Sequence, residues 1–291
     1  MTQTQALKIK PEPAGTDRRI GQILRESGRL SPIDAERVLH LQKETGLRFG
    51  EAALRLGLIS EEDISRAISE QFDYRYLKPG QGNFSTRLIA AYQPFSPQME
   101  VFRAIRSQLM LRWHGEGNKT LAVTSPRRGE GRSYAVSNLA VVFSQLGQRT
   151  LLIDADLRHP SQHDIFALGR NGLGLSDLLA GRGSAECIRR VEEFADLSVL
   201  PAGTLPPNPL ELLSRGKFDA LLSDFASSYD IVLLDTPSGM TSSDAQTVAA
   251  RAGASLLIAR KDMTPFSEAE FLRQMLTAVG CRVVGAVLND F

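Results

Sequence analysis

Continuous apolar runs alternate with amphipathic segments along the C-terminal part of the chain, from about Pro94 to Phe291. The runs cover residues 119–124, 149–154, 197–200, 230–235, 254–260 and 282–288. Because they are apolar throughout instead of alternating with polar residues, they are typical of strands buried on both faces of a parallel sheet. The pattern therefore predicts an α/β fold, in which helices flank a mostly parallel sheet.

The preceding segment is predicted to form a small all-helical domain. Ser31-Pro32 and Ser60-Glu61 are helix-start signals, because a serine hydroxyl accepts the unpaired amide protons of a first turn and proline fits that turn. The first residues are polar and contain proline, which favours disorder, and KPGQGNFS after Leu77 is typical of a linker. The predicted division is 1–16 disordered, 17–77 helical, 78–94 linker and 95–291 α/β domain.

Composition and charge narrow the functional classes. With 42% hydrophobic residues and a net charge of +1, the chain is an ordinary globular protein, and no nucleic-acid partner is expected. The sequence contains no secretory signal and no apolar stretch near the roughly 20 residues of a membrane span, so a cytoplasmic protein is expected. Cys187 and Cys281 fit no metal spacing and are predicted to be reduced core thiols.

A glycine-rich stretch, PRRGEGRS, begins at Pro126 after the first apolar run. Backbone amides of such a loop, leading into a helix, form an anion cradle, and Gly129 and Gly131 allow close approach to phosphates. The alternative is a structural glycine turn. The loop departs from the GxxxxGK[ST] pattern, because Pro126 replaces the first glycine and Arg132 the lysine, although arginine still donates to β- and γ-phosphates. The predicted nucleotide-binding residues are Gly129, Glu130, Gly131, Arg132, Ser133 and Tyr134.

Acidic residues end two of the other runs. Asp154 and Asp156 lie two apart on an extended strand end, so both project toward one magnesium site, and Asp235 ends IVLLD as the Walker B candidate. Buried salt bridges are the alternative, but two Asp after an apolar run are costly unless a cation or partner neutralises them. Phosphoryl transfer needs a carboxylate that orients or deprotonates the attacking hydroxyl. The predicted catalytic residues are Asp154, Asp156 and Arg132, and the predicted metal ligands are Ser133, Asp154, Asp156 and Asp235.

The helical domain contains an internal repeat. The unit that begins at Arg19 recurs at Arg48, 29 residues later. Two stacked helical hairpins with glycines at the turns would explain it without any ligand. The pattern also resembles the N-terminal domain of type II secretion and type IV pilus ATPases, the MshEN family, although Arg25 and Ala53 depart from it. That resemblance implies cyclic di-GMP binding by Arg19, Gly21, Gly28, Gln42, Arg48, Gly50, Gly57 and Gln71.

The three nucleotide motifs together resemble those of the bacterial tyrosine kinases, P-loop proteins that accompany exopolysaccharide chain-length determinants. LLIDADLRHP (151–160) is similar to the Walker A′ motif of that family. LPAGTLPPNPLELL (200–213) resembles the loop after the central strand, and GAVLNDF (285–291) resembles the strand end where Asn289 would contact adenine. The resemblance covers about residues 95–291 and implies a P-loop NTPase fold.

Glu100, Arg103 and Arg106 form an ExxRxxR pattern. On a helix this spacing places one acid and two bases on adjoining turns of one face, which by itself is typical of a solvated charged face. The bacterial tyrosine kinases use such a helix for assembly, so the resemblance implies a homo-oligomeric ring.

The resemblance also implies an activity and partners. It implies autophosphorylation on tyrosine in trans, with ATP and Mg²⁺ as cofactors, and activation by a membrane chain-length determinant of the Wzz-like kind. The tandem repeat and the GEGRS loop are similar to the EpsG-type kinases of exopolysaccharide export. The implied location is cytoplasmic and peripheral to the inner membrane through that partner.

The tyrosine-rich tail of the family is missing, because the chain ends at Phe291. Tyr74 and Tyr76 are the predicted exposed phosphoacceptors, unless they pack onto the helical domain; the remaining candidates are Tyr92, Tyr134 and Tyr229. Two other functions stay open. One is a non-catalytic, ATP-gated assembly module of a polysaccharide export complex, suggested by Arg132 and the missing tail. The other is a ParA/MinD-like ATPase, which relies on a lysine where this chain has Arg127.

Overall fold

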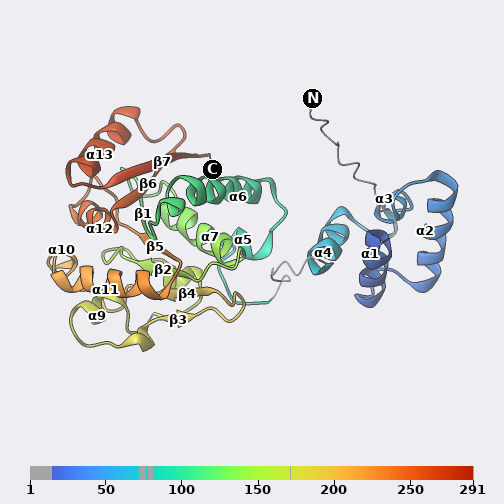
Figure 1. Ribbon diagram of the computed structural model, residues 1–291, viewed down its shortest axis with the longest axis horizontal. Helices are drawn as coiled ribbons and strands as arrows, with labels where there is room; N and C mark the ends of the chain where they lie inside the picture. Colours follow the sequence, from blue (N-terminus) through green and yellow to red (C-terminus); the bar gives the residue numbers. More distant parts are fainter. Residues whose placement is uncertain (1–14, 72–76, 78–80, 171, 291) are drawn as a thin grey trace, which may run out of the picture. The chain divides into compact units, whose positions relative to one another are not determined.

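The computed structural model describes residues 15–71, 77, 81–170 and 172–290, without the side chains of residues 15–19, 65, 69 and 70. It divides the chain into two compact units, Met1–Arg75 and Tyr76–Phe291 (Figure 1). Each unit has its own hydrophobic core. The predicted disordered segment lies outside the described residues except for Gly15 and Thr16, which begin the first helix.

Four helices make up the described part of the first unit: α1 Gly15–Glu26, α2 Pro32–Thr45, α3 Phe49–Arg55 and α4 Glu61–Gln71. Both predicted helix-start signals are confirmed. The Ser31 hydroxyl accepts a hydrogen bond from Asp34 N at 3.1 Å, and Ser60 does the same for Asp63 N at 3.2 Å. The apolar faces of the four helices meet in one small core around Phe49.

In the residues that the structure describes, the second unit is built on a seven-stranded sheet in the order β3-β4-β2-β5-β1-β6-β7. Its strands are β1 Thr120–Thr124, β2 Thr150–Asp154, β3 Arg189–Arg190, β4 Leu197–Leu200, β5 Ile231–Asp235, β6 Ala254–Arg260 and β7 Arg282–Asn289. Every pairing is parallel except that of β3 with β4. All six apolar runs are therefore confirmed as strands. Strand β3 was not predicted, because it consists of two exposed arginines.

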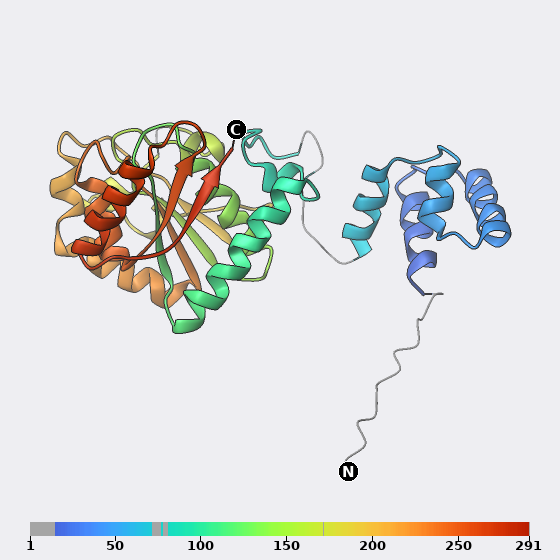
Figure 2. The same cartoon turned by 90° about the horizontal axis from the view of Figure 1, so that it is seen from above.

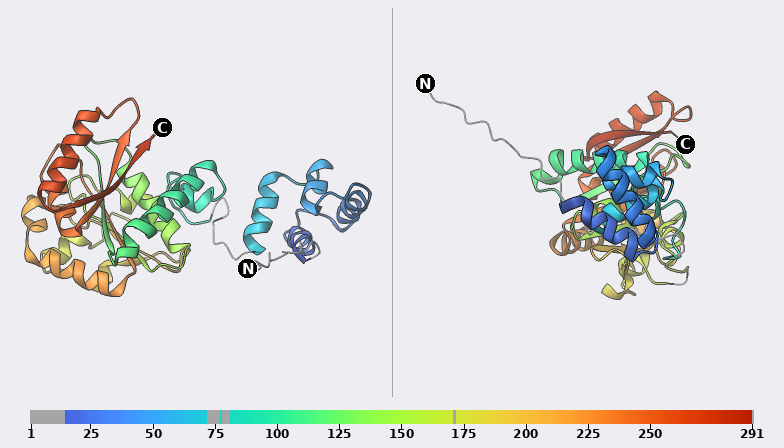
Figure 3. Two further views of the ribbon diagram at one scale, coloured as in Figure 1. Left: turned by 45° about the horizontal axis from the view of Figure 1, so that its top comes forward. Right: turned by 90° about the vertical axis from the view of Figure 1, so that its right-hand side faces the viewer.

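Helices cover both faces of this sheet (Figures 2 and 3). Side chains of β1 alternate between the two cores: Leu121 and Val123 pack toward α6 and α7, and Ala122 toward α12. No helix in the described residues is both long and apolar enough to cross a bilayer. The helices are α5 Ile89–Tyr92, α6 Pro97–Arg112, α7 Arg132–Ser144, α8 Gln162–Ile165, α9 Leu175–Leu179, α10 Pro209–Leu213, α11 Gly216–Ser228, α12 Asp244–Ala252 and α13 Phe266–Ala278, with short 3₁₀ turns η1 His114–Glu116 and η2 Ala185–Cys187.

The predicted linker is wrong in its second half. Leu88, Ala90 and Ala91 are fully buried in the core of the second unit. The buried side chain of Asn138 on α7 accepts a hydrogen bond from Ala90 N at 2.8 Å. Ala90 and Ala91, both small residues of α5, pack against α7, and the spacing of the three buried residues carries no periodic signal that would mark them as core. Residues 78–80 of the predicted linker lie outside the described residues.

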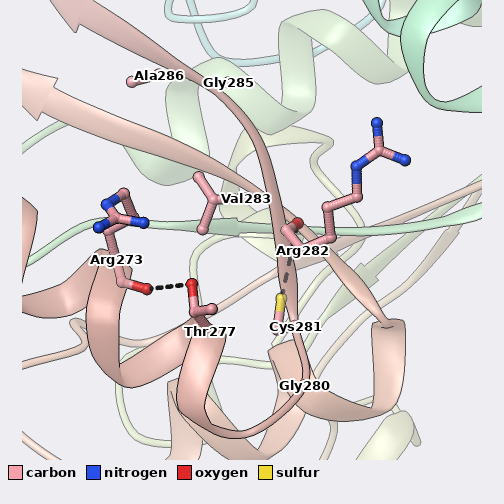
Figure 4. Close-up of a pocket in the computed structure, with 8 residues that line it drawn as sticks. All are labelled: Arg273, Thr277, Gly280, Cys281, Arg282, Val283, Gly285 and Ala286. Carbon is pink, nitrogen blue, oxygen red and sulfur yellow. Dashed lines mark hydrogen bonds between the residues drawn. The ribbon is translucent and has the colours of Figure 1, made fainter.

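Both cysteines are buried free thiols, as predicted. Cys281 lies where α13 turns into β7, beside a shallow surface pocket lined by Arg273, Thr277 and Ala286 (Figure 4). Burial raises the pKa of Cys281 to about 12. This thiol therefore stays protonated and unreactive at neutral pH.

Gly174→Ala is expected to destabilise the second unit by about 3 kcal/mol, the upper range for overpacking. A Cβ on Gly174 would lie 2.1 Å from Pro201 O and 2.4 Å from Gly203 N, both of which are backbone atoms. Gly216→Ala is the matched control, since a Cβ there meets nothing within 4 Å. Urea denaturation of both variants measures the difference. Equal stabilities of the two variants would contradict the close packing at Gly174.

Candidate active site

The glycine-rich loop joins the end of β1 to the start of α7. Gly129 has φ 81° and Gly131 has φ 99°, values that side-chain-bearing residues rarely adopt. Gly131 is also the N-cap of α7 and has no side chain to occupy the first amides of the helix. The start of a helix with unoccupied amides favours an anion. The loop therefore has the backbone form of a phosphate cradle.

Contacts from β6, β7 and the β6–α13 connection hold this loop in shape. The buried Glu130 carboxylate accepts a hydrogen bond from Arg127 N at 2.6 Å and another from the Thr264 hydroxyl. Asn289 Nδ2 donates to Glu130 O at 3.1 Å, and Arg260 donates to Gly129 O at 3.2 Å. Glu130 and Asn289 therefore brace the loop itself. Contact of Asn289 with adenine stays a prediction.

Arg132, the residue in the lysine position, is turned into the protein. Its Nε donates to Thr236 O at 2.8 Å, and its Nη1 donates to Arg127 O at 2.7 Å and to the Ser125 hydroxyl. Burial lowers the pKa of Arg132, while Asp235, Asp156 and Glu130 oppose that shift. The guanidinium thus ties the phosphate loop to the segment after β5. Its predicted role as a phosphate donor requires exchange of some of these bonds.

Asp154 organises the segment that follows β2. Its Oδ1 accepts a hydrogen bond from Asp156 N at 3.2 Å, and its Oδ2 accepts bonds from Ser161 N and Gln162 N, both at 2.9 Å. The side chain is fully buried. Burial, together with the neighbouring Asp235, raises the pKa of Asp154 well above its ordinary value. A carboxylate engaged in this way is better suited to fixing the loop than to accepting a proton from a substrate.

Asp156 has a different environment. Its Oδ1 accepts hydrogen bonds from His159 N at 2.9 Å and from Arg158 N at 3.2 Å, whereas its Oδ2 accepts none from the residues that the structure describes. The charge of Asp156 acts to raise the pKa of both Arg132 and Asp235, so Asp156 lies near both side chains. Of the two predicted bases, Asp156 has the oxygen that is available to a reacting group.

Asp235 meets Asp154 directly across the β2–β5 ladder. Gln162 Nε2 donates to Asp235 Oδ2 at 2.7 Å and to Ser133 O at 3.3 Å. Gln162 is fully buried and links three parts of the site, although it was not among the predicted site residues. A glutamine directly after a serine carries no local signal, because its role depends on contacts with residues distant in sequence.

The donor set fits a magnesium ion. Asp235 Oδ1 is buried and has no hydrogen-bond partner among the described residues, and the Ser133 hydroxyl is a neighbour of this carboxylate. Magnesium is commonly held by one or two carboxylates together with substrate phosphates and water. No cluster of three or more His, Cys, Asp or Glu side chains in the described part of the chain is arranged to hold a metal. Asp235 and Ser133 could therefore hold Mg²⁺. Metal binding by these two residues, and by Asp154 and Asp156, stays a prediction.

Asp235→Asn is expected to stabilise the nucleotide-free protein at neutral pH and to have little effect near pH 4. Burial raises the pKa of Asp235 to about 6 from its ordinary 3.8, against the opposing effect of Ser133 and Gln162. Because the folded state binds this proton more tightly than the unfolded chain, stability falls as the pH rises through this interval and stays level above it. A pKa shift of about two units corresponds to a change of roughly 3 kcal/mol at most in the free energy of unfolding.

Thermal denaturation in EDTA between about pH 4 and pH 8 measures this effect. The exposed Asp224→Asn is the control and should follow the wild type at every pH. A stability gain for Asp235→Asn that is the same at pH 4 as at pH 8 would contradict the assigned cause.

Another buried carboxylate, that of Asp244 at the start of α12, was not among the predicted site residues either. Arg158 forms a two-point ion pair with it, at 2.6 Å and 3.1 Å. The side chain of Asp244 is 1% exposed. This ion pair connects the segment after β2, which carries Asp156, to the segment after β5, which follows Asp235. It therefore restrains both segments in addition to the hydrogen bonds inside the site.

Helix α6 carries the ExxRxxR pattern. Arg103 pairs with Glu100 and also donates to Pro94 O. Arg106 donates to Val142 O, near the C-terminal end of α7, at 3.0 Å. Both arginines therefore make contacts within their own chain. Their part in ring assembly stays a prediction.

The repeat glycines of the first unit have structural explanations. A Cβ on Gly21 would lie 3.1 Å from the Phe49 ring, and one on Gly50 would lie 3.1 Å from Ile64. Gly28 and Gly57 have φ of 71° and 64°, as the turns after α1 and α3 require. Gln42 and Arg48 are described in α2 and at the start of α3, and Gln71 ends α4. The Arg19 side chain lies outside the described residues, and dinucleotide binding stays a prediction.

The described tyrosines are partly buried. The Tyr92 hydroxyl donates to Gly82 O at 2.6 Å, and the Tyr134 ring packs edge-on against Phe102 with centroids 5.7 Å apart. Tyr229 packs against the second core. Because the Tyr134 side chain faces α6, only the backbone amide of Tyr134 is available for the predicted contact with nucleotide. Tyr74 and Tyr76, the predicted exposed acceptors, lie outside the described residues.

Comparison with known proteins finds several relatives, although no protein-family model matches. The chain is 35% identical over 214 residues to the tyrosine-protein kinase YwqD of Bacillus subtilis, covering 73% of this chain and 90% of YwqD. It is 35% identical over 206 residues to the tyrosine-protein kinase Wzc of Salmonella typhimurium, covering 70% of this chain but 28% of that longer protein. The solved structure of the kinase domain of the Escherichia coli tyrosine kinase ETK matches with a TM-score of 0.67 at 33% identity, over 76% of this chain and 86% of that domain.

A more distant likeness concerns the fold alone. The septum site-determining protein MinD of Pyrococcus horikoshii, solved with Mg-ADP, matches with a TM-score of 0.52 at 21% identity over 59% of this chain and 70% of MinD. The mostly parallel sheet with helices on both faces is thus the P-loop NTPase fold, as predicted.

Proposed function

Because the chain belongs to the bacterial tyrosine-protein kinases, we propose that it transfers the γ-phosphoryl group of ATP to tyrosine, including tyrosines of its own chain. The observation that carries this proposal is the meeting of three features at the ends of β1, β2 and β5. They are the glycine-rich loop, the available oxygen of Asp156, and the unpartnered Asp235 Oδ1 beside Ser133.

Each residue has a distinct part in this proposal. The loop amides bind and orient the phosphates, and Arg132 and Gln162 hold the loop and Asp235 in place. Asp156 orients the acceptor hydroxyl and takes its proton. Magnesium, held by Asp235 and Ser133, would neutralise phosphate charge.

Incubation of the purified protein with Mg²⁺ and ATP, followed by mass spectrometry, tests the proposal. Phosphate is expected on tyrosine in the wild type and not in Asp156→Ala, whereas the exposed Asp224→Ala should behave as the wild type. Absence of phosphotyrosine even with the cytoplasmic peptide of a chain-length determinant added would overturn it.

The wider setting follows from the family resemblance. The proposed role is regulation of exopolysaccharide chain length or export, with a Wzz-like membrane protein as activator and a ring of this chain as the working assembly. That activator would hold the protein at the inner membrane. Dependence of tyrosine phosphorylation on the activator's cytoplasmic peptide, and loss of ring assembly in Glu100→Ala, are the measurements.

Cyclic di-GMP sensing by the first unit is a separate proposal. Its support is the tandem repeat of arginine, glycine and glutamine positions, since arginine stacks on guanine and pairs with phosphate. Calorimetric titration of the full chain with cyclic di-GMP should give a heat that is lost in Arg48→Ala. The neighbouring exposed Arg55→Ala serves as control. No heat at high micromolar concentration would overturn this proposal.

A non-catalytic assembly module is the second candidate function. The observation that favours it is the engagement of Arg132 with Thr236 O and Arg127 O, which withholds the cation from the cradle. A pure switch would change its oligomer size between ATP and ADP without turnover. Size measurement beside a phosphotyrosine assay separates the two functions.

A further inference from the structure

A pocket of about 270 Å³ opens beside the candidate active site. It lies between the segment that follows β2, from Pro160 to Arg170, and the segment that follows β4, from Pro201 to Leu205. Strands β2 and β4 are parallel neighbours, so both segments leave the same edge of the sheet as the carboxylates. Ligands of open α/β sheets bind at this edge.

Part of the pocket wall belongs to the same short segment as Asp154 and Asp156. His159 N bonds to Asp156, and Ser161 N and Gln162 N bond to Asp154. Pro160, between them, lines the pocket. Pro160 therefore joins the wall of the pocket to the backbone that bonds to Asp156 and Asp154.

The lining suits an aromatic side chain with a polar tip. Pro160, Pro201 and Leu205 give apolar walls, the largely buried His163 adds a polar group, and the exposed ion pair of Asp164 with Arg170 adds two charged groups. Leu205 is 59% exposed at the rim, where it has apolar area to bury against a partner. A tyrosine side chain combines a large apolar ring with one hydroxyl, which matches this lining.

The pocket is preformed. The turn after α8 holds Ala167 at φ 51°, an uncommon value for alanine, and Leu168 N bonds back to His163 O at 2.8 Å. On the other side, Leu175 N bonds to Pro201 O at 2.8 Å. Strained backbone that the surroundings hold in place is concentrated at binding sites.

We propose that this pocket receives the acceptor tyrosine, carried on a peptide segment whose ring lies between Pro160 and Leu205 and whose hydroxyl faces Asp156. This inference rests on the proposed kinase function and assigns its protein-substrate site. In the transfer, the tyrosine oxygen forms the new bond to the γ-phosphorus as the bond from that phosphorus to the β–γ bridging oxygen breaks. ADP leaves, and the phenolic proton goes to the Asp156 carboxylate.

A synthetic peptide with the sequence of residues 69–79, which contains Tyr74 and Tyr76, serves as the probe. Leu205→Glu is expected to raise the KM for the peptide about tenfold, the effect of losing one apolar contact, and to leave the KM for ATP unchanged. Ala286→Glu is the control, because Ala286 lines the separate pocket on β7 (Figure 4) and should change neither constant.

Direct binding of the same peptide, carrying a fluorescent label, separates a failure of the pocket assignment from a failure of the kinase proposal. Equal peptide affinity for the wild type and Leu205→Glu would overturn the pocket assignment, whether or not phosphate is transferred. If Leu205→Glu binds the peptide more weakly than the wild type does, but the wild type transfers no phosphate to it, the pocket assignment is supported and the kinase proposal is overturned. An equal loss of affinity in Ala286→Glu would also overturn the assignment.

Discussion

Asp156→Asn is expected to lower tyrosine phosphorylation by two to four orders of magnitude, the usual contribution of a general base, without unfolding the protein. The asparagine Oδ1 can still accept the hydrogen bonds that Asp156 Oδ1 receives from His159 N and Arg158 N. What the variant loses is the negative charge and the proton-accepting capacity of the second oxygen. The loss should therefore appear in kcat rather than in the affinity for ATP.

The control for this variant is Asp224→Asn, a charge removal of the same kind at an exposed position. Steady-state kinetics with the peptide, together with calorimetric ATP binding, measure both effects. Phosphorylation by Asp156→Asn within tenfold of the wild type would show that Asp156 is not the base. An unfolded variant would be revealed by its denaturation curve, in which case Asp156→Glu, which keeps the charge, replaces it.

The strands could be predicted because their signal is local. A strand buried on both faces is apolar at every position, and β1, β2 and β5 each read that way in the sequence. Asp154 and Asp235 each end an apolar run, and carboxyl ends of neighbouring parallel strands meet at one edge of the sheet; the ladder register confirms that the two residues are neighbours. The local sequence pattern was sufficient to predict a strand wherever burial on both faces required apolar residues throughout.

The parts that could not be predicted depend on contacts between residues distant in sequence. Gln162 binds Asp235, 73 positions away, and Arg158 pairs with Asp244, 86 positions away. The burial of Ala90 depends on Asn138 in another helix. None of these residues differs in type or spacing from ordinary surface residues, so only the folded chain reveals their roles.

Arg132 illustrates the same limit within a recognised motif. The sequence shows a cation where a phosphate-binding lysine is usual, but it does not show where that cation points. In the structure the guanidinium bonds to Thr236 O and Arg127 O and lies beside three carboxylates, those of Asp235, Asp156 and Glu130. Its first role is consequently to neutralise and join the two loops of the site.

Arg132→Ala is therefore expected to destabilise the nucleotide-free protein by about 3–5 kcal/mol, as the removal of one partner from buried charges does, and to abolish ATP binding. Arg132→Lys keeps the charge, but one ammonium group cannot reproduce the fork of donors. It should recover only part of the stability while restoring phosphate contact. Urea denaturation without nucleotide and calorimetric ATP titration measure the two effects separately.

The neighbouring Arg128→Ala, an exposed arginine of the same loop, is the control and should leave stability unchanged. If Arg132 were a phosphate ligand and nothing more, Arg132→Ala would lose ATP affinity at unchanged stability. In that case the internal bonds of Arg132 would be incidental. A structural role instead predicts that Arg132→Ala loses stability in the absence of ATP and that Arg132→Lys recovers part of it. A phosphate ligand alone cannot produce this result, because no nucleotide is present to be bound.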